Sequence, residues 1–189
     1  MRSSFASCSA TCALLIGLTS CRGAKEGETP SDTTAAATPS RRTLVVGPES
    51  YGPVRFGQPI GTVSSALGEQ LQPAYKDFET CDYVKPTGLP AGTALMVIKD
   101  SVMRVDVDSG GIPTAEGARV GDSEQSVIDL YAGRVTVQPH KYTGPQGHYL
   151  VVRAPADSMY AIIFETDGKR VTSYRAGRRP AVEFVEGCA

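Results

Sequence analysis

The sequence predicts an α+β fold in which two tandem repeats, each a helix followed by an antiparallel sheet, come after a disordered tether. Three features predict it. Residues 55–68 and 119–132 align with each other without a gap and have the spacing of short helices. Short β-type runs separated by turn residues follow each of these two segments. Residues 22–42 show no apolar periodicity, which is typical of a chain that does not fold.

The start of the chain has the pattern of a secretory signal. A charge at Arg2 precedes an apolar run that is too short to span a bilayer, and small residues follow it. The tetrapeptide at 18–21, Leu-Thr-Ser-Cys, resembles the lipobox of bacterial lipoproteins. This resemblance implies that residues 1–20 are a signal peptide and that Cys21 becomes the first residue and carries acyl chains such as palmitate. Enteric lipoproteins retained in the inner membrane have an aspartate after the cysteine, so Arg22 favours the outer membrane.

Residues 21–42 are predicted to be a flexible tether. They are rich in Ala, Thr, Ser, Gly and Pro with scattered charges, so they cannot offset the entropy of becoming ordered. Several acyl chains on one cysteine give stable membrane anchoring. We therefore expect a globular body held at a membrane by the lipid on Cys21.

The charge balance excludes some classes of partner. The 189 residues include 19 Lys and Arg against 20 Asp and Glu, and no basic block suggests a nucleic-acid partner. The hydrophobic content is 41% and no second long apolar run follows the signal, which indicates a soluble globular body.

The cysteines outside the signal predict one disulfide. Cys8 and Cys12 are expected to be removed with the signal, which leaves Cys81 and Cys188 as an even pair in an exported protein. A bridge between them would close a long loop, contribute about 4–5 kcal/mol in the chain-entropy model, and keep the C-terminus from fraying. The alternative is two separate buried thiols.

The first predicted repeat covers residues 43–110. Its helix follows Gly57, and Val63 and Leu67 share one helix face because they are four residues apart. Gly68 is suited to end this helix. The expected strands are 81–84, 93–98 and 102–107, with a turn at 99–101.

The second predicted repeat covers residues 111–189. Its helix follows Gly121, and Val127 and Tyr131 share one face. The Asp-Gly pair at 167–168 is a strong hairpin signal. The expected strands are 135–137, 148–152, 160–164 and 171–174, with 181–185 as a closing strand.

The first helical segment also carries a family resemblance. From Phe56 to Gly68 the pattern apolar-Gly-x-x-x-x-x-Val-x-x-x-Leu-Gly resembles the opening helix of the small outer-membrane assembly lipoproteins. Two such units in tandem resemble the β-lactamase inhibitory proteins, whose halves each pack a helical hairpin on a four-stranded antiparallel sheet. Those inhibitors have a disulfide in each half and tryptophans on the binding face, whereas this chain has one cysteine per predicted repeat and no Trp. The resemblance implies a non-enzymatic, protein-contacting envelope module and does not extend to β-lactamase inhibition.

The densest polar and aromatic stretch is residues 140–149, which holds both histidines of the chain. A zinc site needs three or four ligands, and no cysteine or carboxylate lies close to them in sequence, so no metal is predicted. The histidines are alternatively a base and a sugar- or peptide-contacting group, or turn residues that bond to the backbone. The predicted contact surface consists of His140, Lys141, Tyr142, His148 and Tyr149.

No catalytic site is predicted. The chain has no Gly-x-Ser-x-Gly elbow. The carboxylate pairs Glu79–Asp82 and Asp106–Asp108 have the residue types of a glycosidase but equally the spacing of solvated strand faces. A basic cluster before the last expected strand would suit an acidic partner or lipid headgroups, or form a solvated loop. It consists of Arg175, Arg178 and Arg179.

These observations predict a non-catalytic envelope lipoprotein that acts as a protein-binding or inhibitor-like module. It is expected to need no cofactor and to have another envelope protein as its partner. Two alternatives remain open at this point: a periplasmic or surface hydrolase with a site built from loops, and a structural envelope lipoprotein.

Overall fold

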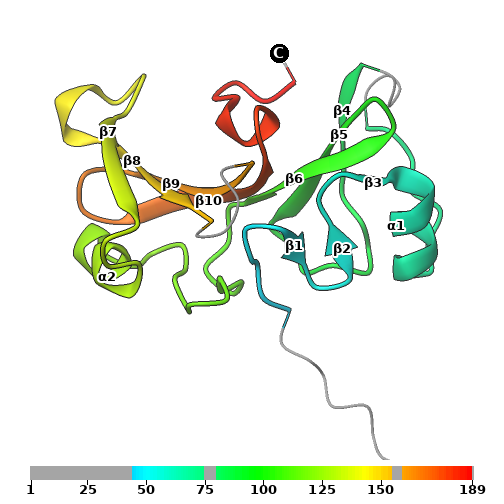
Figure 1. The fold of residues 1–189 in the computed structure, drawn as a ribbon, viewed down its shortest axis with the longest axis horizontal. Helices are drawn as coiled ribbons and strands as arrows, with labels where there is room; N and C mark the ends of the chain where they lie inside the picture. Colours follow the sequence, from blue (N-terminus) through cyan, green and yellow to red (C-terminus); the bar gives the residue numbers. More distant parts are fainter. Residues whose placement is uncertain (1–43, 75–79, 155–158, 189) are drawn as a thin grey trace, which may run out of the picture. The chain divides into compact units, whose positions relative to one another are not determined.

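The computed structural model describes residues 44–74, 80–154 and 159–188. Within them the chain forms an eight-stranded antiparallel sheet and a separate two-stranded sheet (Figure 1). The large sheet has the order β4-β5-β6-β10-β9-β8-β7, and β3 also pairs with β6. The signal peptide, the tether and Cys21 lie outside the described residues. The strands are β1 (Ser50–Tyr51), β2 (Val54–Arg55), β3 (Gln58–Pro59), β4 (Cys81–Val84), β5 (Thr93–Ile98), β6 (Ser101–Val107), β7 (Val135–Pro139), β8 (His148–Arg153), β9 (Tyr160–Thr166) and β10 (Val171–Arg178).

Most of the expected strands are confirmed, since β4 and β5 have the expected bounds and five others start within one residue of them. The turn between β5 and β6 consists of Lys99 and Asp100, which both have positive φ, at 49° and 57°. Two consecutive residues of this kind form the hairpin turn whose twist matches the strands it joins. At the β9–β10 turn, Asp167 Oδ1 accepts hydrogen bonds from the backbone N–H groups of Lys169 and Arg170 at 2.8 Å each.

The two helices are short and lie on the same face of the sheet (Figure 1). Helix α1 (Ile60–Leu67) ends at Gly68, whose φ of 70° is the left-handed conformation that stops a helix. Helix α2 (Glu124–Leu130) begins after Ser123, whose hydroxyl accepts a hydrogen bond from the N–H of Ser126 at 3.1 Å.

The prediction of two helix-plus-sheet repeats is wrong. The regular secondary structure of the described chain is mostly strand, and β6 pairs with β10 in one continuous sheet that joins both predicted repeats. Gly177 permits this pairing, because a Cβ there would lie 2.4 Å from the Met103 carbonyl oxygen and from Arg104 Cβ. Register and close approach across β6–β10 are long-range properties, and neither is visible in the local periodicity of the sequence.

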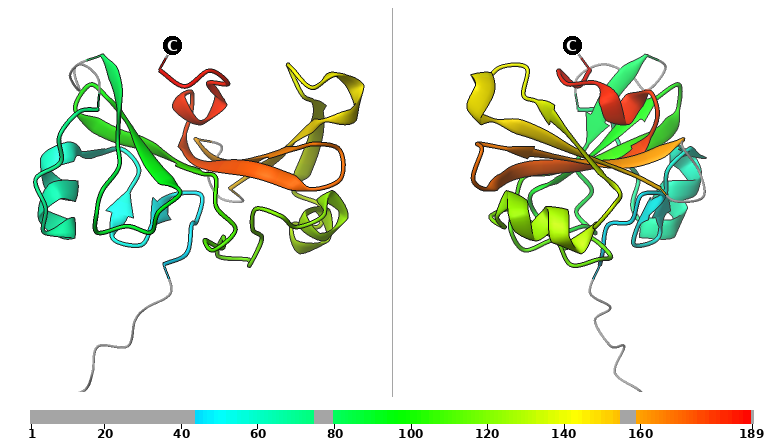
Figure 2. Two further views of the ribbon diagram at one scale, coloured as in Figure 1. Left: turned by 180° about the vertical axis from the view of Figure 1, so that it is seen from behind. Right: turned by 60° about the vertical axis from the view of Figure 1, so that its left-hand side comes forward.

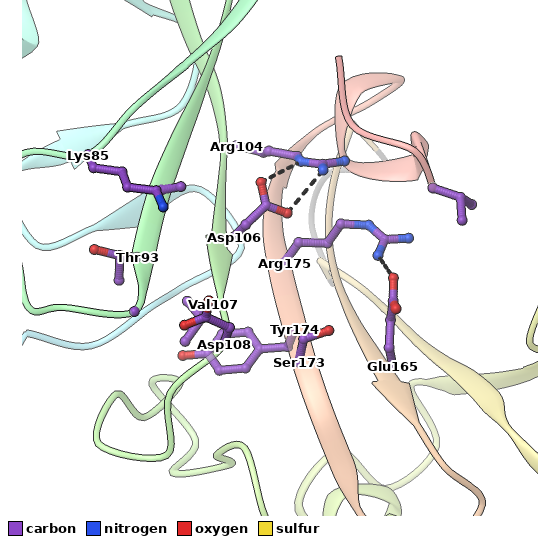
Figure 3. A pocket seen from close by; sticks show the side chains of 13 residues that line it. Lys85, Thr93, Arg104, Asp106, Val107, Asp108, Glu165, Ser173, Tyr174 and Arg175 are labelled. Atoms are coloured by element: carbon purple, nitrogen blue, oxygen red, sulfur yellow. Dashed lines mark hydrogen bonds and ion pairs between the residues drawn. The ribbon is translucent and has the colours of Figure 1, made fainter. Parts of the chain in front are cut away.

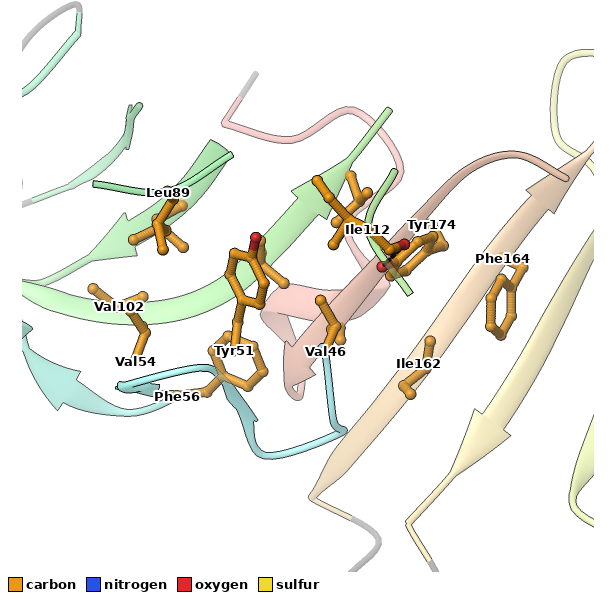
Figure 4. Close-up of a cluster of buried hydrophobic side chains, with 14 of the residues drawn as sticks. Val46, Tyr51, Val54, Phe56, Leu89, Val102, Ile112, Ile162, Phe164 and Tyr174 are labelled. Carbon is orange, nitrogen blue, oxygen red and sulfur yellow. Dashed lines mark hydrogen bonds between the residues drawn. The ribbon is translucent and has the colours of Figure 1, made fainter. Parts of the chain in front are cut away.

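The main core lies between the sheet and the elements that cover its helical face (Figure 4). Its largest buried side chains are aromatic: Tyr131 and Tyr174 both contact Phe164, with ring centroids 5.8 and 5.4 Å apart. The hydroxyl of Tyr174 donates to the Ile112 carbonyl at 2.9 Å. Burial raises the pKa of Tyr51 to about 12.

The last residues turn onto the other face of the sheet, and we call Pro180–Cys188 the C-terminal strap. The expected closing strand at 181–185 is wrong: this segment begins with the 3-10 helix η2 (Ala181–Glu183) and adds no strand to the sheet. The strap ends at a disulfide between Cys81 in β4 and Cys188, which confirms the expected bridge. Figure 2 shows the strap and the helices on opposite sides of the sheet.

Candidate functional site

The predicted contact residues divide between the two faces of the sheet. His140, Lys141 and Tyr142 follow β7, whereas His148 and Tyr149 open β8. The rings of His140 and Tyr149 stack with centroids 4.4 Å apart. His148 instead places its Nδ1 2.9 Å from Oε1 of Glu124 in helix α2. Successive strand residues point to opposite faces, so the two histidines do not meet.

Hydrogen bonds to His140 hold the loop that follows it. Its Nδ1 accepts hydrogen bonds from the backbone N–H groups of Tyr142 and Thr143, at 3.1 and 3.3 Å. Its Nε2 lies 3.3 Å from Oε2 of Glu165. Because Nδ1 is an acceptor, this network assigns the proton to Nε2, which donates to the carboxylate. The loop-positioning role of His140 matches the predicted alternative of a histidine that bonds to backbone.

The surroundings of His148 do not form a hydrolytic triad. The hydroxyl of Thr166 donates to Glu124, and the same carboxylate contacts His148. In a triad the imidazole lies between the hydroxyl and the carboxylate, whereas here the carboxylate lies between the other two groups. Among the residues that the structure describes, no three His, Cys, Asp or Glu side chains are grouped as metal ligands.

The strap is held by two arginines that the contact-surface prediction did not include. Arg104 in β6 is only 3% exposed, and its Nη1 donates to the carbonyls of Ala181 and Phe184 at 2.8 and 2.7 Å. Its Nε donates to Oδ2 of Asp106 at 3.0 Å, and its Nη2 donates to the hydroxyl of Tyr83 at 2.7 Å. Every side of this guanidinium is therefore engaged.

Arg175 in β10 is the second of these arginines and is 5% exposed. Its Nε donates to the Val182 carbonyl at 2.7 Å, and its Nη1 pairs with Glu165. Its guanidinium carbon also lies 5.7 Å from the centre of the Tyr149 ring. Arg175 thus links the strap to the carboxylate that holds His140.

Two ionisable groups near the strap have raised pKa values. Burial raises the pKa of Asp106, and the Arg104 guanidinium beside it opposes that rise. Burial, followed by the negative charge of Asp106, raises the pKa of Tyr83 to about 12. Both shifts have partial burial beside the strap as their largest cause.

Two hollows flank the strap on the same face of the sheet. The larger, of about 330 Å³, lies over β5, β6 and β10, with Lys85 and Asp108 among its lining residues (Figure 3). The smaller, of about 170 Å³, lies over β8 and β9. Arg175 and Val185 line both hollows, so the strap crosses a longer groove without filling it.

A surface patch joins the predicted contact loop to the strap. Tyr142 is 59% exposed and Phe184 is 40% exposed. Lys141 Nζ donates to Oε1 of Glu186 at 2.8 Å, and the Tyr142 hydroxyl donates to the same carboxylate. A hollow of about 250 Å³ is lined by Lys141, Phe184 and Glu186. We call Lys141, Tyr142, Phe184 and Glu186 the aromatic patch.

The remaining candidates do not assemble a site. Asp106 is paired with Arg104 and is not a free acid or base, although Asp108 lines the same hollow. Glu79 lies outside the described residues, and Asp82 is buried with its Oδ1 accepting from the Tyr83 N–H at 2.6 Å.

The predicted basic cluster before the last strand is not a solvated loop. Arg175 and Arg178 belong to β10, whereas Arg179 pairs with Glu183 in the strap. A signal for the arginines under the strap does exist in the sequence: Arg104 lies between Met103 and Val105, and Arg175 lies between Tyr174 and Ala176. A charge with non-polar neighbours on both sides in a strand has to be paired where it is buried.

Known proteins show a structural likeness to this chain but no match of a family model or a curated sequence. No family model and no curated protein matches the chain. A solved structure resembles part of it. The crystal structure of the uncharacterized protein yfeY from Escherichia coli covers 71% of this chain with 99% of its own, at 13% identity and a TM-score of 0.44. A likeness at this level carries no functional argument.

Within the described residues, no helix has the length and apolarity to cross a bilayer.

Proposed function

We propose that this protein is a non-catalytic, lipid-anchored envelope module that binds another protein through the aromatic patch. The observation that carries the proposal is the composition of the patch. The exposed Phe184 lines a hollow together with Lys141 and Glu186, and the exposed Tyr142 donates a hydrogen bond to that glutamate. Aromatic side chains that fill or border pockets are enriched among the residues that dominate binding energy at protein interfaces.

The described polar clusters favour binding over catalysis. The Glu165 carboxylate is shared between His140 and Arg175, and Glu124 is shared between His148 and Thr166. Each of these carboxylates joins two elements of the fold. A hydrolytic site needs a nucleophile in contact with a base that a third group orients, and neither cluster has that order.

The placement of the chain ends also supports an anchored binding module. The described chain begins with Leu44, which packs against the main core on the helical side of the sheet. The strap lies on the opposite side (Figure 2). A tether that leads from Leu44 to a lipid on Cys21 would attach on the helical side. The aromatic patch would then remain accessible to a neighbouring protein.

The test is a cross-linked pull-down from intact cells with the anchored protein as bait. The variant Tyr142→Ser/Phe184→Ser removes both aromatic side chains of the patch. The matched control Val137→Ser/Met159→Ser removes two apolar side chains of similar exposure elsewhere, at 49% and 42%. We expect one envelope protein to be enriched by the unmodified bait and by the control, and about tenfold less by the patch variant, a loss of about 1.4 kcal/mol.

Two results would contradict the proposal. Equal capture by the patch variant would place the contact elsewhere on the molecule. No enriched protein, together with a change in membrane permeability on deletion, would indicate the structural role instead.

A further inference from the structure

The strap is held in the way that a binding groove holds a peptide. Three of its carbonyls, those of Ala181, Val182 and Phe184, accept hydrogen bonds from the guanidinium groups of Arg104 and Arg175. Hydrogen bonds to the main chain fix a segment regardless of its side chains, and pockets beside them supply selectivity.

Side-chain pockets accompany these main-chain contacts. Val182 is fully buried in a small cluster on the strap face, against strands β8 and β9, and Val185 packs against that cluster. One residue further on, Glu186 is bound by Lys141 and Tyr142. The face therefore selects two aliphatic side chains three residues apart, followed by a carboxylate.

The strap is separable from the rest of the fold. The main core lies on the helical face and includes no strap residue, whereas the cluster under the strap has only five buried members. The covalent hold on the strap is the disulfide from Cys188 to Cys81. Opening that bond leaves hydrogen bonds, one small apolar cluster and surface ion pairs to keep the strap in place.

We propose that the strap is an internal ligand and that its release opens a groove for a segment of a partner protein that has the same chemistry and adopts the same turn. The partner segment carries two aliphatic residues three positions apart and an acidic residue directly after the second. The two hollows beside the strap give room for a segment longer than the strap itself. This inference deepens the proposed function, on which it rests, by naming the chemical class of the partner segment. The partner first contacts the intact aromatic patch, and its segment then replaces the strap residues Phe184 and Glu186 beside Lys141 and Tyr142.

The test uses the chain from Arg22 to Ala189, which contains every described residue. In the variant Val182→Asp/Cys188→Ser the strap loses its apolar anchor and its covalent link. The probe is a fluorescein-labelled peptide with the sequence of residues 180–187, and the control peptide has Asp at both valine positions. Fluorescence anisotropy measures the binding of each peptide.

We expect the variant to bind the strap peptide at least about tenfold more tightly than the control peptide, a difference of about 1.4 kcal/mol. The unmodified, oxidised chain should bind the strap peptide at least about tenfold more weakly, because its own strap competes at a high effective concentration. Equal binding of the two peptides would overturn the inference. A folded variant that binds neither peptide would also overturn it.

A second measurement keeps the inference testable if the variant does not fold. Hydrogen exchange of the unmodified chain is compared before and after reduction of the Cys81–Cys188 bond. We expect the strap amides to exchange faster after reduction while β9 and β10 stay protected. Unchanged strap exchange, or simultaneous loss of protection in the whole sheet, would show that the strap is not a releasable element.

The two proposals fail in distinguishable ways. If no partner is captured from cells but the strap peptide binds, the groove remains and the proposed function is wrong. If a partner is captured through the aromatic patch but the peptide does not bind, the proposed function remains and the strap is a fixed part of the fold.

Discussion

Arg104 directs its guanidinium at partners from three parts of the chain. It pairs with Asp106, donates to the Tyr83 hydroxyl, and donates to two strap carbonyls. A guanidinium with so little exposure needs this degree of pairing, because an unpaired buried charge is costly. Arg104 therefore determines whether the strap face is a stable surface.

Replacing Arg104 tests that dependence. Arg104→Met leaves Asp106 without its counter-ion and the strap carbonyls without donors. We expect the free energy of unfolding to fall by about 3 kcal/mol. This value is at the lower end of the range for breaking a buried ion pair, because Asp106 is partly exposed. Urea denaturation measures the change. The control Arg55→Met removes an exposed arginine and should stay within about 0.5 kcal/mol; a loss below about 1 kcal/mol for Arg104→Met would contradict the assigned role.

Glu186 makes the attachment of the strap to the contact loop dependent on pH. Hydrogen bonds from Lys141 and Tyr142 lower the pKa of the Glu186 carboxyl below its ordinary value of 4.5. A carboxyl with a lowered folded-state pKa stabilises the contact above 4.5, and that contribution is lost as the pH falls through the folded-state pKa. We expect the strap amides to exchange faster in that acidic range, with β9 unchanged.

The variant Glu186→Gln is the control for the pH effect. It removes the titrating group while it keeps the size of the side chain. Strap exchange in this variant, after correction for the intrinsic exchange rate, should show no step below pH 4.5. If the step persists, another group is responsible for it.

The hairpin between β5 and β6 is an element whose turn can be improved. Lys99 and Asp100 both adopt positive φ, a conformation that glycine and asparagine adopt with less strain. We expect Lys99→Asn/Asp100→Gly to raise the free energy of unfolding by about 1 kcal/mol in urea denaturation. The control Asp108→Gly makes the same change at a residue without positive φ and should lower it by about 0.5–1 kcal/mol. Destabilisation by the turn variant would show that the native side chains supply a contact of their own.

Strands were predictable from the sequence where local pattern alone defines them. The apolar run of β5 and the Asp-Gly turn after β9 identified their hairpins because both signals lie within a few residues. The segment 181–185 has the composition of a strand, yet its carbonyls bond to Arg104 and Arg175 instead of to a neighbouring strand. Tertiary contacts override β-propensity there.

The candidate site was predictable only in part, for the same reason. The exposed Tyr142 lies in the stretch that the sequence singled out, because aromatic density is a local signal. The partners that complete the aromatic patch, Phe184 and Glu186, come from a segment more than forty residues later. A histidine pair at the ends of one loop also looked like a unit, but the alternation along β8 sends His148 to the opposite face.

At the scale of the whole molecule, the pairing of β6 with β10 joins the two predicted repeats, residues 43–110 and 111–189, into one sheet. Arg104 and Arg175 come from these two central strands, one from each predicted repeat. The strap face therefore exists only because the halves merge: two separate sheets would not place both arginines under the same segment. The β6–β10 pairing that makes the two-repeat prediction wrong is therefore also the feature that creates the candidate groove.

The anchoring of the molecule is tested by changing Cys21 in the full-length chain. Cys21→Ala removes the thiol that the lipobox resemblance assigns to acylation, so the acyl chains should be absent by mass spectrometry and the protein should leave the membrane fraction. Cys12→Ala is the matched control, because it makes the same change within the predicted signal and should leave anchoring intact. Since acyl chains contribute about 0.8 kcal/mol per buried methylene, loss of all of them should shift nearly all of the protein. If Cys21→Ala stays membrane-bound, the lipobox interpretation of residues 18–21 is wrong.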